Sequence, residues 1–116
     1  MDKLLSLLGI ARRAGKLALG NDPVLEAIRK REAKLLLAAG DVSPRTLKGV
    51  MAVSQTEGIP VIQTTVSMDE LGFAIGKRVG ILSVNDAGFA DKMTQLWDDI
   101  TNKPQKKAYK EETRWQ

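Results

Sequence analysis

The feature that most constrains the fold is a short apolar segment, Leu35–Ala39, which follows a segment with the residues of a helix N-terminus. The largely apolar residues 33–39, which include this segment, are too few for a helix of their own, and they indicate a central strand covered on both faces. Upstream, the side chains of Asn21 and Asp22 can cap a helix, and Pro23 suits the first helical position because it has no N–H to leave unpaired. The sequence therefore predicts a turn, a helix and a buried strand in succession.

The alternation of helix and strand continues along the chain. Ser43 and Pro44 have the same capping pattern and predict a helix that runs to about Glu57 and ends at Gly58. The remaining predicted elements are helices over residues 2–14, 22–31, 68–75 and 87–101, and strands over residues 16–19, 59–63 and 79–84. Asn85 or Asp86 caps the last helix. Short strands that alternate with helices predict an α/β fold with helices on both faces of a small sheet.

The composition argues against an enzyme. The 116 residues contain no cysteine and no histidine, which excludes disulfides, thiolate catalysis and the commonest general base. The segment Gly72–Arg78 is not a phosphate-binding loop, because its two glycines are one residue too close and Arg78 occupies the position of the magnesium-binding Ser or Thr. The adjacent carboxylates Asp69-Glu70 and Asp98-Asp99 point in different directions on a helix. We therefore expect no catalysis, no cofactor and no metal site.

The net charge of +4 is concentrated at the two ends of the chain. Residues 1–34 hold eight Lys and Arg against four acids, and residues 103–116 hold five against two, whereas residues 35–102 hold five against eight. Such asymmetry favours a polyanionic partner. No apolar stretch is long enough to span a membrane and the N-terminal segment is amphipathic rather than a signal peptide, so the prediction is a cytoplasmic protein without a membrane partner.

Residues 102–116 form a basic, polar tail that we expect to be disordered when unbound. Its cations alternate with Tyr109 and Trp115, and this mixture suits RNA, because cations meet phosphates and aromatic rings stack on unpaired bases. The alternative is a tail that only adds solubility. The sequence leaves both interpretations open.

Several short motifs occur in one order along residues 4–96. They include Ala14–Leu17, Gly20–Asp22, Asp41–Pro44, Gly58–Val61 and Glu70–Gly72. With these motifs the chain resembles the L7Ae/L30e ribosomal protein family, and within it the short bacterial, YlxQ-like members. The resemblance implies one domain over residues 1–101, with a three-layer α-β-α sandwich around a four-stranded mixed sheet.

Members of this family bind kink-turn RNA, a sharply bent helix with tandem sheared G·A pairs. The resemblance therefore implies a non-catalytic RNA-binding protein of the translation machinery and its ribonucleoproteins. Its implied partner is a structured RNA, either a kink-turn or ribosomal RNA, with association with the ribosome as a further implication. The family default is a monomer.

The resemblance also implies which residues contact RNA. They are the turn and first helical turn at Gly20, Asn21, Asp22 and Pro23, the helix positions Glu26 and Lys30, the upstream Lys16, and the loop Gly76, Lys77, Arg78 and Val79. We expect the helix start and the cationic loop to form a single patch.

The chain departs from the ribosomal members at three of these positions. They carry Asn-Glu where this chain has Asp22-Pro23, and a lysine where it has Glu26. A carboxylate repels a phosphate, and Pro23 has no N–H to donate. An alternative function is therefore a protein–protein adaptor of the translation machinery, on the same fold but with a weakened RNA site. An enzyme on a small α/β fold is the third hypothesis, and no residue constellation supports it.

Overall fold

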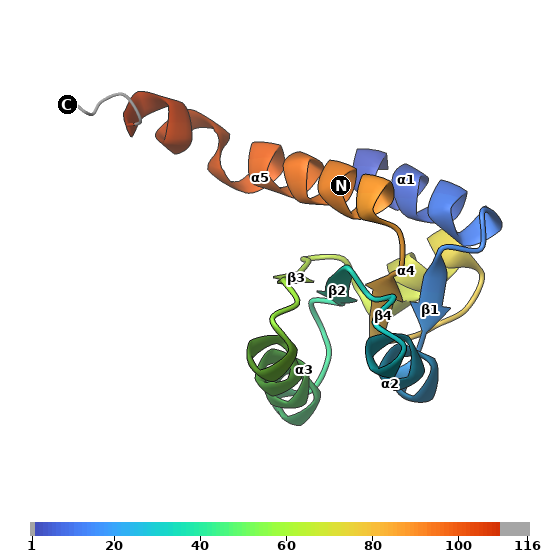
Figure 1. Cartoon of the computed structure of the whole chain (residues 1–116). Helices are drawn as coiled ribbons and strands as arrows, with labels where there is room; N and C mark the ends of the chain where they lie inside the picture. Colours follow the sequence, from blue (N-terminus) through green and yellow to red (C-terminus); the bar gives the residue numbers. More distant parts are fainter. Residues whose placement is uncertain (1, 110–116) are drawn as a thin grey trace.

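The computed structural model describes the backbone of residues 2–109 and the side chains of residues 3–101 (Figure 1). The described residues form five helices and one four-stranded sheet. In chain order the elements are α1 (Asp2–Arg13), β1 (Leu17–Leu19), α2 (Asn21–Arg29), β2 (Leu35–Ala38), α3 (Pro44–Glu57), β3 (Val61–Gln63), α4 (Met68–Ile75), β4 (Ile81–Val84) and α5 (Ala87–Tyr109).

The sheet is mixed, with the strand order β1-β4-β2-β3. Strand β4 is antiparallel to both β1 and β2, whereas β2 and β3 are parallel. Strands β1, β2 and β3 therefore run in one direction, and their carboxyl ends lie at the same edge of the sheet. Helices α2, α3 and α4 begin at this edge, and the loop that enters β4 reaches it too because β4 runs the opposite way. We call it the carboxyl edge.

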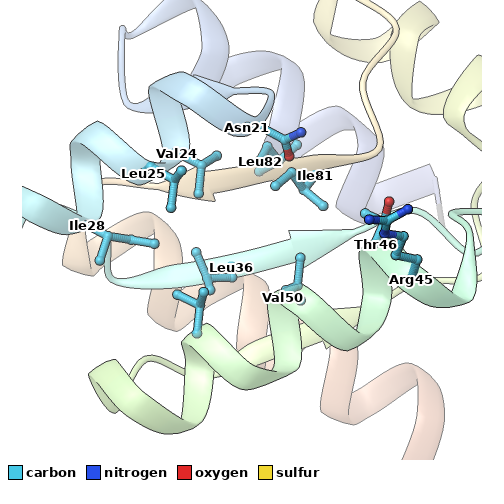
Figure 2. A pocket seen from close by; sticks show the side chains of 12 residues that line it. Asn21, Val24, Leu25, Ile28, Leu36, Arg45, Thr46, Val50, Ile81 and Leu82 are labelled. Carbon is cyan, nitrogen blue, oxygen red and sulfur yellow. The ribbon is translucent and has the colours of Figure 1, made fainter.

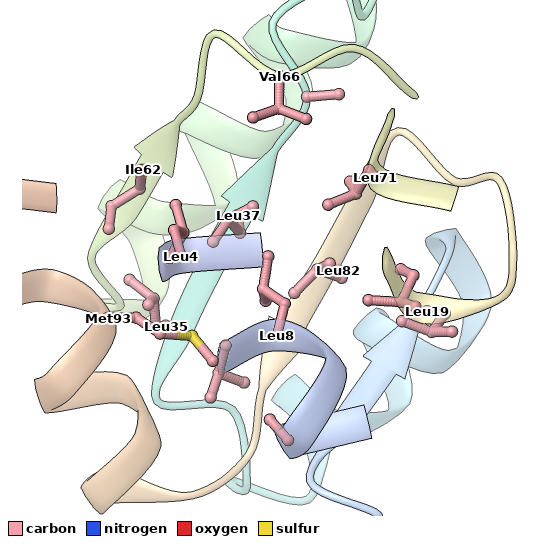
Figure 3. Packing of buried hydrophobic residues seen from close by; sticks show 14 of the residues in the cluster. Leu4, Leu8, Leu19, Leu35, Leu37, Ile62, Val66, Leu71, Leu82 and Met93 are labelled. Atoms are coloured by element: carbon pink, nitrogen blue, oxygen red, sulfur yellow. The ribbon is translucent and has the colours of Figure 1, made fainter. Parts of the chain in front are cut away.

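The helices cover both faces of the sheet, as predicted (Figure 1). Alternate residues of β2 point to opposite faces. Leu35 and Leu37 pack into the larger core beneath α1, α4 and α5, and Leu36 packs with Val24 of α2 and Val50 of α3. Figure 3 shows the larger core, whose fully buried members include Leu4, Leu8, Leu71, Leu82 and Met93. The three-layer sandwich around a mixed sheet is confirmed.

The start of α2 differs from the prediction. The helix begins at Asn21, with Gly20 at the N-cap, so neither Asn21 nor Asp22 caps it and no side chain takes that role. Pro23 is the third helical residue rather than the first. It fits there because the first hydrogen bond of the helix runs from the N–H of Val24 to the carbonyl of Gly20, at 3.1 Å, so a donor at position 23 is not needed.

The other predicted caps are confirmed. The Ser43 side chain accepts from the N–H of Thr46 at 3.1 Å, and Ser67 and Glu70 form a reciprocal capping box at the start of α4. Asp86, rather than Asn85, caps α5, because its carboxylate accepts from the N–H of Phe89 at 2.9 Å.

Helix α5 continues to Tyr109, beyond the predicted end at residue 101. The predicted domain boundary at that point and the predicted disorder of the tail in the unbound protein stay predictions. Trp115 lies outside the described residues. Within the part of the chain that is described, no helix combines the length and the apolar composition needed to cross a bilayer.

Gly40, at the end of β2, should be intolerant of a side chain. A Cβ there would lie 2.7 Å from the carbonyl oxygen of Thr64, which is backbone and cannot rotate away. We expect Gly40→Ala to lower the free energy of unfolding, measured by urea denaturation, by about 1–3 kcal/mol. Gly49 in α3 is the control, because a Cβ there meets nothing within 4 Å. Gly49→Ala should raise stability by about 0.5–1 kcal/mol. Equal stability of the two variants would contradict this account.

Candidate functional site

The carboxyl edge brings the start of α2 next to the loop 76–80, two segments far apart in the sequence. The N–H of Gly20 donates to the carbonyl of Ile81 at 3.0 Å. A Cβ at Gly20 would lie 4.0 Å from Cγ1 of Val79. The two segments line a shared hollow of about 330 Å³, with Ser43 and Met68 on its other walls. The expected juxtaposition of the two segments is therefore observed at the Val79 end of the loop, whereas the cations Lys77 and Arg78 line a different hollow.

The N-terminus of α2 is open. Gly20 has φ 90° and ψ 173°, a backbone conformation that is essentially restricted to glycine. A glycine at the N-cap has no side chain to accept from the first-turn N–H groups, which lack partners within the helix. The positive end of the helix dipole lies there as well. Ser43 and Ser67 each accept from one first-turn N–H of α3 and α4, whereas no side chain accepts from the first turn of α2, which therefore offers its donors to an anion or a base edge.

The polar residues of α2 are accessible, and the negative charge of Glu26 partly offsets the positive charge of the helix. Asn21, Asp22 and Lys30 are exposed and Glu26 is half-buried. The Glu26 carboxylate pairs with Arg29 and with Lys30, the latter at 3.6 Å. Exposed ion pairs contribute only about 0–1 kcal/mol, so these cations can exchange a carboxylate for a phosphate at little cost.

The loop after α4 contributes two cations, of which Arg78 is in an ion pair and Lys77 is in none with the side chains that the structure describes. Gly76 ends α4 in a left-handed conformation, φ 84°, and Lys77 follows it as an exposed side chain. Arg78 donates to Oδ1 of Asp69 at 2.6 Å, and this hydrogen bond raises the pKa of Arg78. The sequence predicts two exposed cations here. Both are exposed, but the charge of Arg78 is balanced by Asp69.

Two predicted site residues lie differently from the rest. Val79 lines the shared hollow but is only 8% exposed, because its side chain packs into the larger core. Lys16 lies at the other end of β1, where its carbonyl accepts from the N–H of Asn85 at 2.8 Å. Four residues of extended chain, roughly 13 Å, separate it from Gly20. The structure therefore does not bring Lys16 into the patch around Gly20.

A groove between α2 and α3 was not predicted (Figure 2). It has a volume of about 260 Å³ and a mostly apolar lining that includes Val24, Ile28 and Val53, with Leu25 at 54% exposure on its rim. Asn21, Arg45 and Thr46 stand at the end nearest the carboxyl edge (Figure 2). The apolar residues of both helices are visible in the sequence, but a groove depends on how far apart two helices lie, which the sequence does not show.

The comparisons with known proteins agree with this architecture. Residues 2–94 match the model of the ribosomal protein L7Ae/L30e/S12e/Gadd45 family. The RNA-binding protein YlxQ of Bacillus subtilis is 39% identical over 93 residues, covering 79% of this chain and 92% of that protein.

Two solved structures are similar to the fold. A Bacillus halodurans protein of unknown function is 34% identical, with a TM-score of 0.79 over 84% of this chain and 99% of its own. The Giardia lamblia 15.5kD RNA binding protein has a TM-score of 0.68 at 17% identity, over 81% of each chain, which is a likeness of fold. The chain belongs to the ribosomal protein L7Ae/L30e/S12e/Gadd45 family.

The conformation of Gly20 gives a direct test of this local geometry. Gly20→Ala should lower the free energy of unfolding by about 1–3 kcal/mol, because alanine does not adopt φ 90° with ψ 173° without strain. Gly58 is the matched control. It has φ 70° and ψ 30°, a left-handed conformation that asparagine tolerates, so Gly58→Asn should cost less. Chemical denaturation measures the free energy of unfolding of both variants. A larger decrease for Gly58→Asn than for Gly20→Ala would contradict the strained conformation described for Gly20.

Proposed function

We propose that this protein binds structured RNA of the kink-turn class through the carboxyl edge, without catalysis. The observation that carries the proposal is the uncapped N-terminus of α2, which lies beside the loop 76–80 on one surface. Membership of a family of ribosomal proteins and 39% identity to a protein named as RNA-binding support the same class of partner.

The geometry suits a bent RNA helix. The major groove of regular A-form RNA is too narrow for a helix end, but a sharp bend widens it locally. The N–H groups at the start of α2 and the exposed Asn21 side chain would then meet base edges and phosphates. Lys77, which is exposed in the loop after α4, would supply charge for the RNA backbone near this point, whereas Lys30 is the C-cap of α2 and lies at the other end of the helix.

Asp22, Pro23 and Glu26 modify this interface. Pro23 offers neither a backbone donor nor a polar side chain, and the loss of one bidentate base contact costs about 1–3 kcal/mol of discrimination. Glu26 holds Arg29 and Lys30 in ion pairs, which lowers the positive charge that the helix presents. Asp22 keeps a carboxylate that can accept from a guanine amino group. The proposed site is thus altered relative to the ribosomal members and keeps its open helix end.

A pair of RNAs tests the specificity. We expect calorimetric titration to show tighter binding to a kink-turn RNA than to the same RNA with its sheared G·A pairs replaced by Watson–Crick pairs. The reason is that the replacement straightens the helix and closes the groove that the start of α2 enters. Equal affinity for the two RNAs, with a steep dependence on salt, would leave only charge-driven binding and would contradict kink-turn recognition.

The charge at position 26 gives a second test. Glu26→Lys removes a carboxylate from the proposed footprint and frees Arg29 and Lys30, so we expect about 5- to 30-fold tighter binding to the kink-turn RNA at low salt and a steeper salt dependence. Glu57→Lys is the matched control, because Glu57 is exposed at the far end of α3 from the carboxyl edge. Tighter binding by both variants alike would show a non-specific effect of net charge.

The α2–α3 groove favours a second candidate, the protein–protein adaptor. Its apolar lining and the half-exposed Leu25 are features of a surface that contacts protein rather than nucleic acid. Binding of neither RNA in the titrations would favour this candidate. A cytoplasmic location, a monomeric state and association with the ribosome stay predictions.

A further inference from the structure

Phe73 is the most exposed of the large apolar side chains described. It lies on α4 at 91% exposure, and Ile10 of α1, at 48%, stands nearby across a shallow groove. A single exposed apolar residue is common on protein surfaces and needs no explanation. The neighbours of Phe73 set it apart, because each of the two hollows that it lines also includes basic side chains.

These basic side chains come from two elements that the fold brings together. On one side of Phe73, the groove between α1 and α4 is bounded by Arg13. On the other side, a second hollow is lined by Lys77 and Arg78. Arg12 is held at the end of α4, where its Nε donates to the carbonyl of Ile75 at 3.1 Å.

The acids of this region do not cancel its positive charge. Asp69 is paired with Arg78. The Glu70 carboxylate accepts from the N–H of Ser67 in the capping box and keeps its negative charge, which offsets only one of the three cations Arg12, Arg13 and Lys77. Among the side chains that the structure describes, Arg12, Arg13 and Lys77 enter no ion pair. An exposed aromatic ring near unpaired cations suits single-stranded nucleic acid, because the ring can stack on a base while the cations contact the adjoining phosphates.

We infer that Arg12, Arg13, Phe73 and Lys77 form a second RNA surface, the α1–α4 face, which binds unpaired nucleotides that flank the folded RNA. The inference rests on the proposed function. The α1–α4 face continues directly from the proposed interface, because Lys77 belongs to both. Gly72 of α4 also packs closely against the loop, since a Cβ added at Gly72 would lie 3.1 Å from the Arg78 Cα. An RNA strand that leaves the carboxyl edge over the loop 76–80 reaches Phe73 next. This footprint would explain why Phe73 is exposed.

The experiment compares a blunt kink-turn RNA with the same RNA carrying single-stranded uridine extensions at its ends, by fluorescence anisotropy. The wild-type protein should bind the extended RNA more tightly. Phe73→Ala should weaken binding to the extended RNA by about 5- to 150-fold, the range for losing one stacked base, and leave binding to the blunt RNA unchanged. Phe73→Trp should keep the wild-type affinity for the extended RNA. Phe73→Leu should lose it, because leucine keeps apolar bulk without a stacking face.

Met51→Ala is the matched control, because Met51 is also exposed, at 48%, but lies on α3 on the opposite face of the sheet. Sedimentation of wild-type and Phe73→Ala proteins tests whether Phe73 instead mediates contact between two copies of the chain. An oligomer that dissociates on Phe73→Ala, with RNA affinity unchanged, would overturn the inference.

The remaining outcomes separate this inference from the proposed function. Wild-type binding to the blunt RNA with no gain from the extensions would overturn the α1–α4 face and leave the proposed function intact. If the protein binds only the extended RNA and Phe73→Ala weakens that binding, the result would support the α1–α4 face and contradict kink-turn recognition. Binding to neither RNA would overturn both.

Discussion

The direction of β4 determines which helix starts and which loop meet at the carboxyl edge of the sheet. Because β4 runs antiparallel between β1 and β2, those two strands and β3 all point the same way. Their carboxyl ends meet at one edge, so α2, α3 and α4 begin there. The loop before β4 arrives at the same edge for the same reason. A patch made of a helix start and a distant loop is thus a consequence of strand direction.

Gly20 converts this topology into a potential binding site. In each of the other two helices that start at this edge, a serine side chain accepts from one first-turn N–H. Gly20 has no side chain that could accept from the first-turn N–H groups of α2, and its backbone conformation forms the turn between β1 and α2. The start of α2, which has no side-chain cap, therefore offers backbone donors to a bound acceptor, and a count of charges would not reveal this.

Much of the fold could be predicted from the sequence because local chemistry determined it. The apolar Leu35–Ala39 segment and the caps at Ser43 and Ser67 involve residues within a few positions of one another. The prediction of capping by Asn21 and Asp22 was wrong because a preceding glycine can start a helix without a side-chain cap.

The details of the candidate site were harder to predict because they depend on tertiary packing. Burial of Val79, the ion pair of Arg78 and the α2–α3 groove all involve residues far apart in the chain. The contacts of β1 and α1 have a further consequence for how the chain acquires its structure. In the described part of the chain β1 lies at the sheet edge and pairs with β4, and α1 packs against α4 and α5. Native pairing of β1 therefore cannot form until β4, more than 60 residues further along the chain, has been synthesised.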